Sequence, residues 1–293
     1  IKESGVFRIG FFGDSFVEAK QVSIENTFFR IIDDSLSNNN IEVLAFGNSG
    51  WGTCHSYAVS KKYSAIYDID LVVYVFSEND LGDQIYNIKK ADSMPYPYLD
   101  KKGDLFIDNS LSIKNLIKRE RFRLFEFIFR KSYLAQNIYR RILLLKNYGI
   151  KISVSDDDMK MSNKQLEGIY PKPNDLPSIW SEEISKNAIE LAEKILDKWE
   201  NNLTEKNKKF VIFYIPRETE WLKPDTKQDS WKHWISTYSR ENNVEFIDPT
   251  EEFYLYKNKG KKLYDDHLSV DGHIAFSQSF IKWFNNLSIR LMD

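Results

Sequence analysis

Short apolar runs separated by polar turns recur along the first third of the chain. Apolar side chains dominate Phe7–Phe12, Ile41–Phe46 and Leu71–Phe76, and each run stops at a cluster of small or polar residues. Apolar residues at helical spacing lie between these runs, over about residues 25–36 and 54–66. A repeated order of strand, polar turn and helix predicts βαβ units and a parallel sheet, whose strands are apolar on both faces because helices cover both.

The same alternation returns in the last third of the chain. Apolar residues recur at helical spacing over about residues 179–202, and the strand-like run Phe210–Ile215 follows them. Three further elements are expected, namely a helix near residues 228–242, a short strand Val244–Ile247 and a helix over about residues 271–287. The fold class predicted from this order is α/β, with a central parallel sheet between layers of helices.

Residues 85–180 interrupt the alternation. Residues 86–108 contain two prolines, which predict an irregular excursion or a small hairpin. Apolar residues at helical spacing predict helices over residues 111–147, and the prolines of residues 171–177 indicate a mobile loop. We therefore expect one domain over residues 1–293, with a largely helical insertion or cap at about residues 85–180.

The predicted helices of residues 111–147 are strongly basic. They carry ten lysine or arginine residues against two acidic residues. One interpretation is a packed helical cap with a solvated basic face. The other is a lid that contacts an anionic surface, either membrane headgroups or an acidic glycan. The whole chain has a formal net charge of -2, so its overall charge does not favour a nucleic acid as partner.

Composition narrows the chemistry further. Cys54 is the only cysteine, which excludes an internal disulfide and a metal site built from several cysteines. The 4 histidines are dispersed without paired spacing, so we expect no zinc site, and the chemistry below needs no organic cofactor. No apolar run is long enough to span a bilayer. The sequence begins at Ile1 rather than methionine, and we expect a targeting segment to be missing from it. The oligomeric state stays open.

Candidate chemistry gathers where the first three predicted strands end. Gly13-Asp14-Ser15 follows the first strand, Gly50 lies in the turn after the second, and Asn79 follows the third. Carboxyl ends of parallel strands lie at one edge of a sheet, where ligands bind. A hydroxyl nucleophile, a backbone N–H and a side-chain amide would meet there, as acyl transfer through a tetrahedral intermediate requires. Each residue alone also fits a helix cap or an ordinary turn.

A base for such a nucleophile stands late in the chain, in Asp265-Asp266-His267 before the last predicted helix. Residues i and i+2 of an extended segment point to the same side, so Asp265 can orient the ring of His267 only where the backbone turns suitably. A lone histidine also fits a surface or core position. The second histidine with an acidic neighbour, His273, falls inside the last predicted helix and is the weaker candidate.

Taken in order, these segments resemble the four sequence blocks of the SGNH/GDSL hydrolase superfamily. The matching residues are Gly13-Asp14-Ser15, Gly47-Asn48-Ser49-Gly50, Ser77-Glu78-Asn79-Asp80, and Asp265-Asp266-His267-Leu268-Ser269 with Gly272-His273. The resemblance spans the whole chain and implies a three-layer flavodoxin-like fold. It implies Ser15 as nucleophile and His267 as base, with the Ser15 N–H, the Gly50 N–H and the Asn79 amide as oxyanion hole.

Two positions depart from the superfamily's pattern. Ser77 stands where the third block usually has glycine, two positions before the asparagine. Tyr264 stands where the usual aspartate precedes the histidine by three, so Asp265 takes the role of the acid in an Asp-x-His variant. This variant resembles the last block of acetyltransferase-like members that modify exopolysaccharides.

The function implied by the resemblance is that of a serine esterase with a triad of Ser15, His267 and Asp265. We expect it to cleave a small acyl ester, above all an acetyl ester on a carbohydrate, through an acyl-enzyme. An O-acyltransferase that passes the acyl group to a sugar hydroxyl is the first alternative, and a non-catalytic glycan-binding domain is the second. Members with this layout are often exported or membrane-tethered bacterial proteins, and we expect an extracytoplasmic location here too.

Overall fold

A computed structural model describes residues 2–37, 40–85, 89, 94–100, 102, 104–110, 113–114, 117, 182–216 and 230–290. The chain divides into two compact units. The first unit comprises Ile1–Lys89, Leu99–Leu105 and Lys186–Asp293, and the second comprises Lys90–Tyr98 and Phe106–Ser185. The second unit falls almost wholly within the predicted insertion, while the single domain over residues 1–293 stays a prediction. Most of the basic segment 111–147 and all of the proline-bearing loop 171–177 lie outside the described residues.

The first unit contains a five-stranded parallel sheet. Its strands are β1 (Phe7–Gly13), β2 (Ile41–Gly47), β3 (Leu71–Phe76), β6 (Lys209–Tyr214) and β7 (Glu245–Ile247). Their spatial order is β2-β1-β3-β6-β7, and all neighbours run parallel. This is the flavodoxin-like order, in which the chain reverses its direction of winding between β1 and β3. The predicted α/β fold with a central parallel sheet is therefore confirmed.

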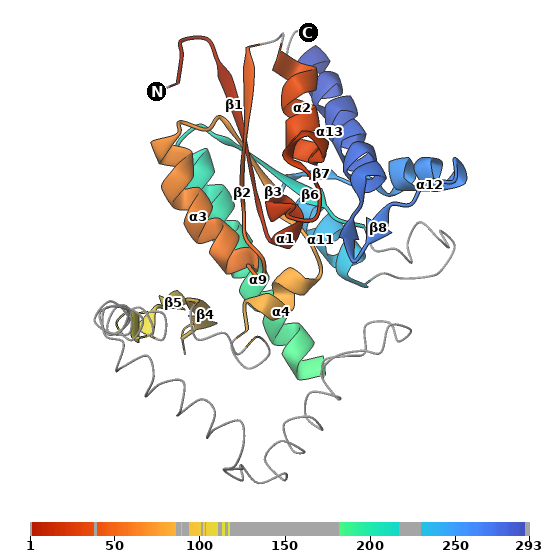
Figure 1. Cartoon of the computed structure of the whole chain (residues 1–293). Coiled ribbons are helices and arrows are strands. Elements are labelled where there is room, and N and C mark those ends of the chain that lie inside the picture. Colours follow the sequence, from red (N-terminus) through yellow and green to blue (C-terminus); the bar gives the residue numbers. More distant parts are fainter. Residues whose placement is uncertain are drawn as a thin grey trace, which may run out of the picture. The chain divides into compact units, whose positions relative to one another are not determined.

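Helices α2 (Phe28–Leu36), α12 (Thr250–Asn258) and α13 (Val270–Arg290) cover one face of the sheet (Figure 1). Aromatic rings from the strands and helices interlock there. The Phe11 ring of β1 lies 4.9 Å from the ring of Phe280 in α13, in an edge-to-face contact with an interplanar angle of 64°. This aromatic layer fixes α13, whose first turn follows the predicted base.

Helices α3 (Thr53–Ile66) and α9 (Glu182–Thr204) cover the other face (Figure 1). Helix α11 (Ser230–Glu241) is hydrogen-bonded to α9 through two side chains. Among the residues that the structure describes, Trp199 of α9 is the largest fully buried side chain. Its indole packs on rings from three strands and from α3, the contacts being with Phe12, Tyr57, Tyr74 and Phe210. The three layers predicted from the resemblance are thus present in the described part of the chain.

Some local elements differ from the sequence prediction. The helix expected over residues 25–36 is a 3-10 turn at Ile24–Asn26 followed by α2. Helix α12 and the antiparallel pair β8 (Tyr264–Asp265) and β9 (His267–Leu268) were not predicted. Strands β4 (Tyr96–Leu99) and β5 (Leu105–Asp108) form a two-stranded sheet, as the alternative of a small hairpin predicted. Within the described ranges, no helix combines the length and apolar character needed to cross a bilayer.

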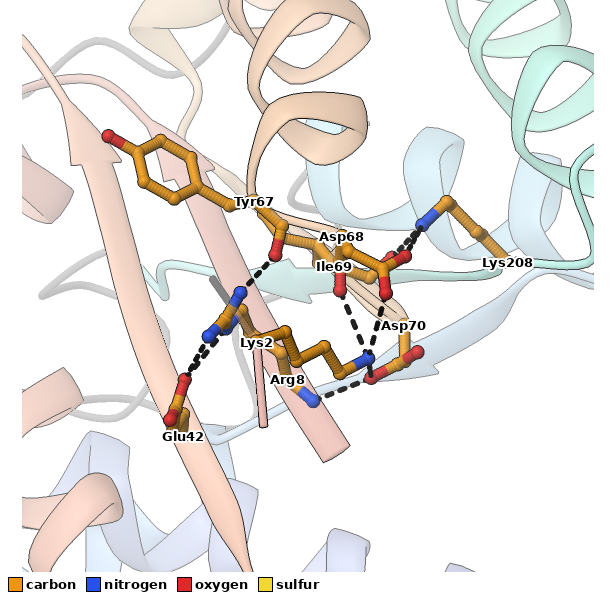
Figure 2. A network of polar contacts seen from close by, with 8 residues as sticks. All are labelled: Lys2, Arg8, Glu42, Tyr67, Asp68, Ile69, Asp70 and Lys208. Atoms are coloured by element: carbon orange, nitrogen blue, oxygen red, sulfur yellow. Dashed lines mark hydrogen bonds and ion pairs between the residues drawn. The ribbon is translucent and has the colours of Figure 1, made fainter. Parts of the chain in front are cut away.

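Arg8 connects the amino-terminal ends of β1 and β2 through hydrogen bonds and an ion pair (Figure 2). It is buried near the start of β1, and its Nε donates to Oε2 of Glu42 in β2 at 2.8 Å. Its Nη1 donates to the carbonyl of Tyr67, which follows α3. Its Nη2 also donates to Oε2 of Glu42, and a buried guanidinium with these three contacts holds β1, β2 and the end of α3 in one arrangement.

A second set of ionic contacts anchors the start of the chain to β3 and β6 (Figure 2). Lys2 pairs with the carboxylate of Asp70, which also accepts the Arg8 N–H at 2.7 Å. Lys208, just before β6, lies 3.3 Å from a carboxylate oxygen of Asp68. Both sets lie at the amino-terminal ends of the strands. The opposite edge of the sheet is left for a ligand.

Candidate active site

Ser15 stands at the carboxyl end of β1. Strand β1 ends at Gly13, and the short helix α1 (Ser15–Glu18) begins two residues later. Asp14 caps this helix, because its Oδ1 accepts the Phe16 N–H at 2.9 Å. A Cβ on Gly13 would lie 2.9 Å from the carbonyl oxygen of Val75 in β3, so only glycine fits there. The close approach of β1 and β3 thereby places Ser15 at the point where the winding of the sheet reverses.

The structure brings His267 to Ser15, although 252 positions separate them in the sequence. The Nε2 of His267 lies 2.8 Å from Oγ of Ser15. Strand β9 carries His267, and the Phe16 ring lies 5.0 Å from the imidazole. The imidazole side chain is 29% exposed, so water reaches this site. A hydroxyl in hydrogen-bond contact with an imidazole is the arrangement of an activated serine.

The carboxylate beside the outer nitrogen of this imidazole belongs to Asp266. Its Oδ2 lies 3.5 Å from Nδ1 of His267, and its side chain is 96% exposed. The predicted acid, Asp265, instead pairs with Lys262 at 2.9 Å. This placement has a local cause, since Asp266 adopts a φ of 68° and the chain folds back so that residues 265 and 267 pair across it. The geometry thus favours Asp266 over Asp265 as the neighbour of the base, and the catalytic role of either stays a prediction.

Two backbone N–H groups are placed to receive a negative oxygen. Among the described residues, the N–H groups of Ser15 and Gly50 donate no hydrogen bond. Gly50 has a φ of 78°, which favours glycine. Glu18 holds the same loop, because its Oε2 accepts both the Ser49 N–H at 2.9 Å and the Ser49 hydroxyl. These positions agree with the predicted oxyanion hole, whose role stays a prediction.

Asn79, the third predicted oxyanion donor, is engaged with carboxylates. It begins α4 (Asn79–Asp83), and its Nδ2 lies 2.8 Å from Oδ2 of Asp14 and 3.2 Å from Oδ2 of Asp83. An amide has two hydrogens, so both are taken in this state. Asn79 therefore reaches an oxyanion only by releasing one carboxylate. The contact to Asp83 is the longer of the two, and Lys89 pairs with that carboxylate at 2.8 Å.

A buried polar cluster lies behind the nucleophile. It contains two fully buried carboxyl groups, those of Asp14 and Asp80. Burial raises the pKa of Asp14, and hydrogen bonds from Asn79 and Phe16 oppose that rise. Burial and the charge of Asp14 raise the pKa of Asp80 well above its usual range. The Tyr74 hydroxyl donates to Oδ2 of Asp80 at 2.6 Å. This tyrosine interrupts an otherwise apolar strand, and a buried tyrosine hydroxyl needs a partner.

Two of the other histidines are buried and accept backbone hydrogen bonds. His273 is fully buried in α13, where its Nδ1 accepts the Phe28 N–H at 3.2 Å, and burial lowers its pKa to about 4. The Nδ1 of His55 accepts the Gly52 N–H at 2.9 Å. Within the part of the chain that the structure describes, no three His, Cys, Asp or Glu side chains are grouped to hold a metal ion.

Three polar residues of this site are not predicted as part of it from the sequence. They are Glu18, which fixes the Gly50 loop, Asp266 beside the base, and Ser77 between the buried carboxyls. In the sequence, Ser77 is visible only as a departure from the superfamily's usual glycine, and its hydroxyl is the one signal of this role.

Solved structures with a similar fold include esterases and other hydrolases. An acetyl xylan esterase, AlAXEase, matches with 14% identity and a TM-score of 0.50, over 94% of this chain and 98% of that chain. LAE5, an alpha/beta hydrolase enzyme from the metagenome of Lake Arreo, Spain, matches with 11% identity and a TM-score of 0.50, over 96% of each chain. A member of the lipolytic protein G-D-S-L family from Veillonella parvula DSM 2008 has 11% identity and a TM-score of 0.48, over 96% of this chain and 99% of that chain.

Sequence comparisons add no closer relation. A scan against models of protein families finds no match, and a search of curated proteins finds none either. The matches to AlAXEase and LAE5 establish the fold alone, a parallel sheet between two layers of helices, as the sequence predicted.

Proposed function

We propose that this chain is a serine esterase that removes a small acyl group, with acetyl on a carbohydrate as the expected substrate. The observation that carries the proposal is the 2.8 Å contact between Ser15 Oγ and His267 Nε2 at the reversal point of the sheet. The shared fold with a protein named as an acetyl xylan esterase supports the choice of acyl group and of substrate class.

In the first half-reaction, Oγ of Ser15 attacks the ester carbonyl carbon while Nε2 of His267 takes the hydroxyl proton. The carbonyl oxygen becomes negative and accepts hydrogen bonds from the N–H groups of Ser15 and Gly50. The imidazolium then gives its proton to the departing sugar oxygen as the C–O bond breaks. Asp266 stabilises the positive ring from the Nδ1 side.

In the second half-reaction, water attacks the acyl-enzyme. His267 takes one proton from the water and returns it to Oγ of Ser15 as the acyl bond breaks, which releases the carboxylic acid. The partial exposure of the imidazole leaves room for that water. Every step uses groups of this chain, and each proton passes through the single nitrogen that faces the serine.

Hydrolysis of para-nitrophenyl acetate and of acetylated xylo-oligosaccharides tests the proposal. We expect activity in the wild type and its loss in Ser15→Ala. Ser35→Ala is the matched control, because Ser35 is an exposed serine on α2 whose hydroxyl donates to the carbonyl of Ile31. Equal measurable rates for wild type and Ser15→Ala would remove the nucleophile assignment. No activity in the folded wild type would leave the non-catalytic glycan-binding alternative.

Acyl transfer to a sugar hydroxyl is the second candidate. The Asp-x-His sequence of Asp265-Asp266-His267 favours it through its resemblance to exopolysaccharide-modifying members. Both reactions share the acyl-enzyme and differ only in whether water or a sugar hydroxyl attacks it. Product analysis with a deacetylated oligosaccharide present as acceptor separates them. Acetylated acceptor exceeding free acetate supports transfer, and free acetate alone supports hydrolysis.

A further inference from the structure

The Ser77 hydroxyl lies between the two buried carboxyl groups. Its Oγ is 2.9 Å from Oδ2 of Asp14 and 3.2 Å from Oδ1 of Asp80. All three side chains are buried, and both carboxyls are fully so. Glycine is usual at the position of Ser77 in the resembling superfamily, so this bridge is a feature of the present chain.

The hydrogens around this hydroxyl are too few for two carboxylates. Ser77 has one hydroxyl hydrogen, and it faces Oδ2 of Asp14 and, at 2.8 Å, Oδ1 of Asn79. Asp14 also accepts the Phe16 N–H and the Asn79 amide, as an ionised carboxylate does. The hydroxyl hydrogen is therefore directed to the Asp14 side. The contact between Ser77 Oγ and Asp80 Oδ1 then holds a hydrogen only if Asp80 supplies it.

The other oxygen of Asp80 has donors of its own. Its Oδ2 accepts the Tyr74 hydroxyl at 2.6 Å and the Ser77 N–H at 3.3 Å. The Thr53 hydroxyl lies 3.0 Å from that of Tyr74 and completes the chain of donors. A carboxylic acid fits this pattern, because one oxygen accepts while the other donates.

We propose that Asp80 is a neutral carboxylic acid that donates its Oδ1 proton to Ser77, whose hydroxyl in turn donates to the ionised Asp14. The charged and titratable groups that face Asp80 are Asp14, Tyr74 of β3, and Asp83 of α4. Among the described residues, Lys89 pairs with the neighbouring Asp83, and no cation pairs with Asp14 or Asp80. A second negative charge would thus stand beside Asp14 in a fully buried place, which is strongly unfavourable. The raised pKa of Asp80 agrees with this arrangement.

The consequence for the site passes through Asp14. The ionised Asp14 caps the helix that begins at Ser15 and holds the Asn79 amide. Asp80 and Ser77 are thereby positioning residues, since they complete the hydrogen bonds of Asp14 without reaching a substrate. This part rests on the proposed esterase function, whereas the protonation of Asp80 does not.

Infrared spectroscopy tests the protonation directly. At neutral pH the folded protein should show the C=O stretching band of a buried protonated carboxylic acid. The band should vanish in Asp80→Asn, whose amide keeps one donor and one acceptor, and it should persist in Asp34→Asn, which changes an exposed carboxylate of α2. It should shift in Ser77→Gly, because the acceptor of the proton is lost. No band in the wild type, or an unchanged band in Asp80→Asn, would overturn the proposal.

Two further measurements test the protonation of Asp80 separately from the proposed esterase function. The band should remain in Ser15→Ala, so a failure of the proposed function leaves it intact. If the chain is an esterase, Asp80→Ala should lower kcat and Asp80→Asn should restore it to within about fivefold of the wild type, because a neutral donor is retained. A folded Asp80→Asn protein no more active than Asp80→Ala would overturn the positioning role. Should the alanine variant fail to fold, the infrared band decides alone.

Discussion

Replacing Asp266 by asparagine removes the carboxylate beside the base and keeps the size of the side chain. The magnitude of the effect follows from the geometry, because this carboxylate is 96% exposed and lies 3.5 Å from Nδ1 of His267. Solvent-exposed ion pairs of this kind change an equilibrium by about fivefold or less. A buried triad aspartate, in contrast, contributes about 10⁴-fold to turnover. We therefore expect Asp266→Asn to lower kcat by about fivefold or less, and by less still in high salt, which screens exposed charges.

The assay is the kcat for para-nitrophenyl acetate at low and high ionic strength. Asp265→Asn is the matched control, since it is the same substitution one residue earlier, where the carboxylate pairs with Lys262. We expect the control to match the wild type. A loss of about 10²-fold or more in either variant, in the direction of the about 10⁴-fold loss of a buried triad acid, would refute this reasoning. It would show that the carboxylate closes over the imidazole during catalysis.

Three further predictions concern loop position, acid stability and the opposite edge of the sheet. Glu18→Ala releases Ser49 and should lower kcat by up to about 10²-fold, the effect of losing one oxyanion donor, with KM little changed. Glu18→Gln should recover part of this kcat, and an unchanged kcat in Glu18→Ala would contradict the prediction. The pKa of His273 is near 6.5 in the unfolded chain and about 4 in the folded one, so the free energy of unfolding should fall by about 3 kcal/mol as pH drops between those values. Denaturant unfolding at several pH values should show a smaller dependence of this free energy on pH in His273→Gln, and an identical dependence would contradict the prediction. Arg8→Met should cost about 2 kcal/mol in unfolding experiments through its lost contacts to Glu42 while kcat stays unchanged, and a lower kcat at full stability would contradict it.

The sheet and its covering helices follow from the sequence because burial leaves a clear apolar pattern. Every side chain of Leu71–Phe76 is buried, as a strand covered on both faces requires. Helix α12 left no such pattern, since Tyr254 and Leu255 are exposed and only Phe253 is buried. A helix with one buried residue cannot be recognised from apolar spacing.

Positions in the site that are set by the ends of strands can be predicted from the sequence. Contacts that depend on the conformation of single residues cannot. The carboxyl ends of β1 and β3 are adjacent in any sheet of this order, so Ser15 and Asn79 could be expected to lie close together. The exchange of Asp265 for Asp266 depends on one residue with a φ of 68°, which no periodicity reveals. The bridge from Ser77 to Asp14 joins residues 63 positions apart, and only the folded chain shows it.

Labelling with a fluorophosphonate probe, followed by mass spectrometry of the peptides, tests most directly whether Ser15 is an activated nucleophile. The probe reacts with activated serines whatever their natural substrate. We predict one label, on Ser15, that is absent from Ser15→Ala and strongly reduced in His267→Ala. No label on Ser15 in the folded wild type, or equal labelling in His267→Ala, would contradict the account.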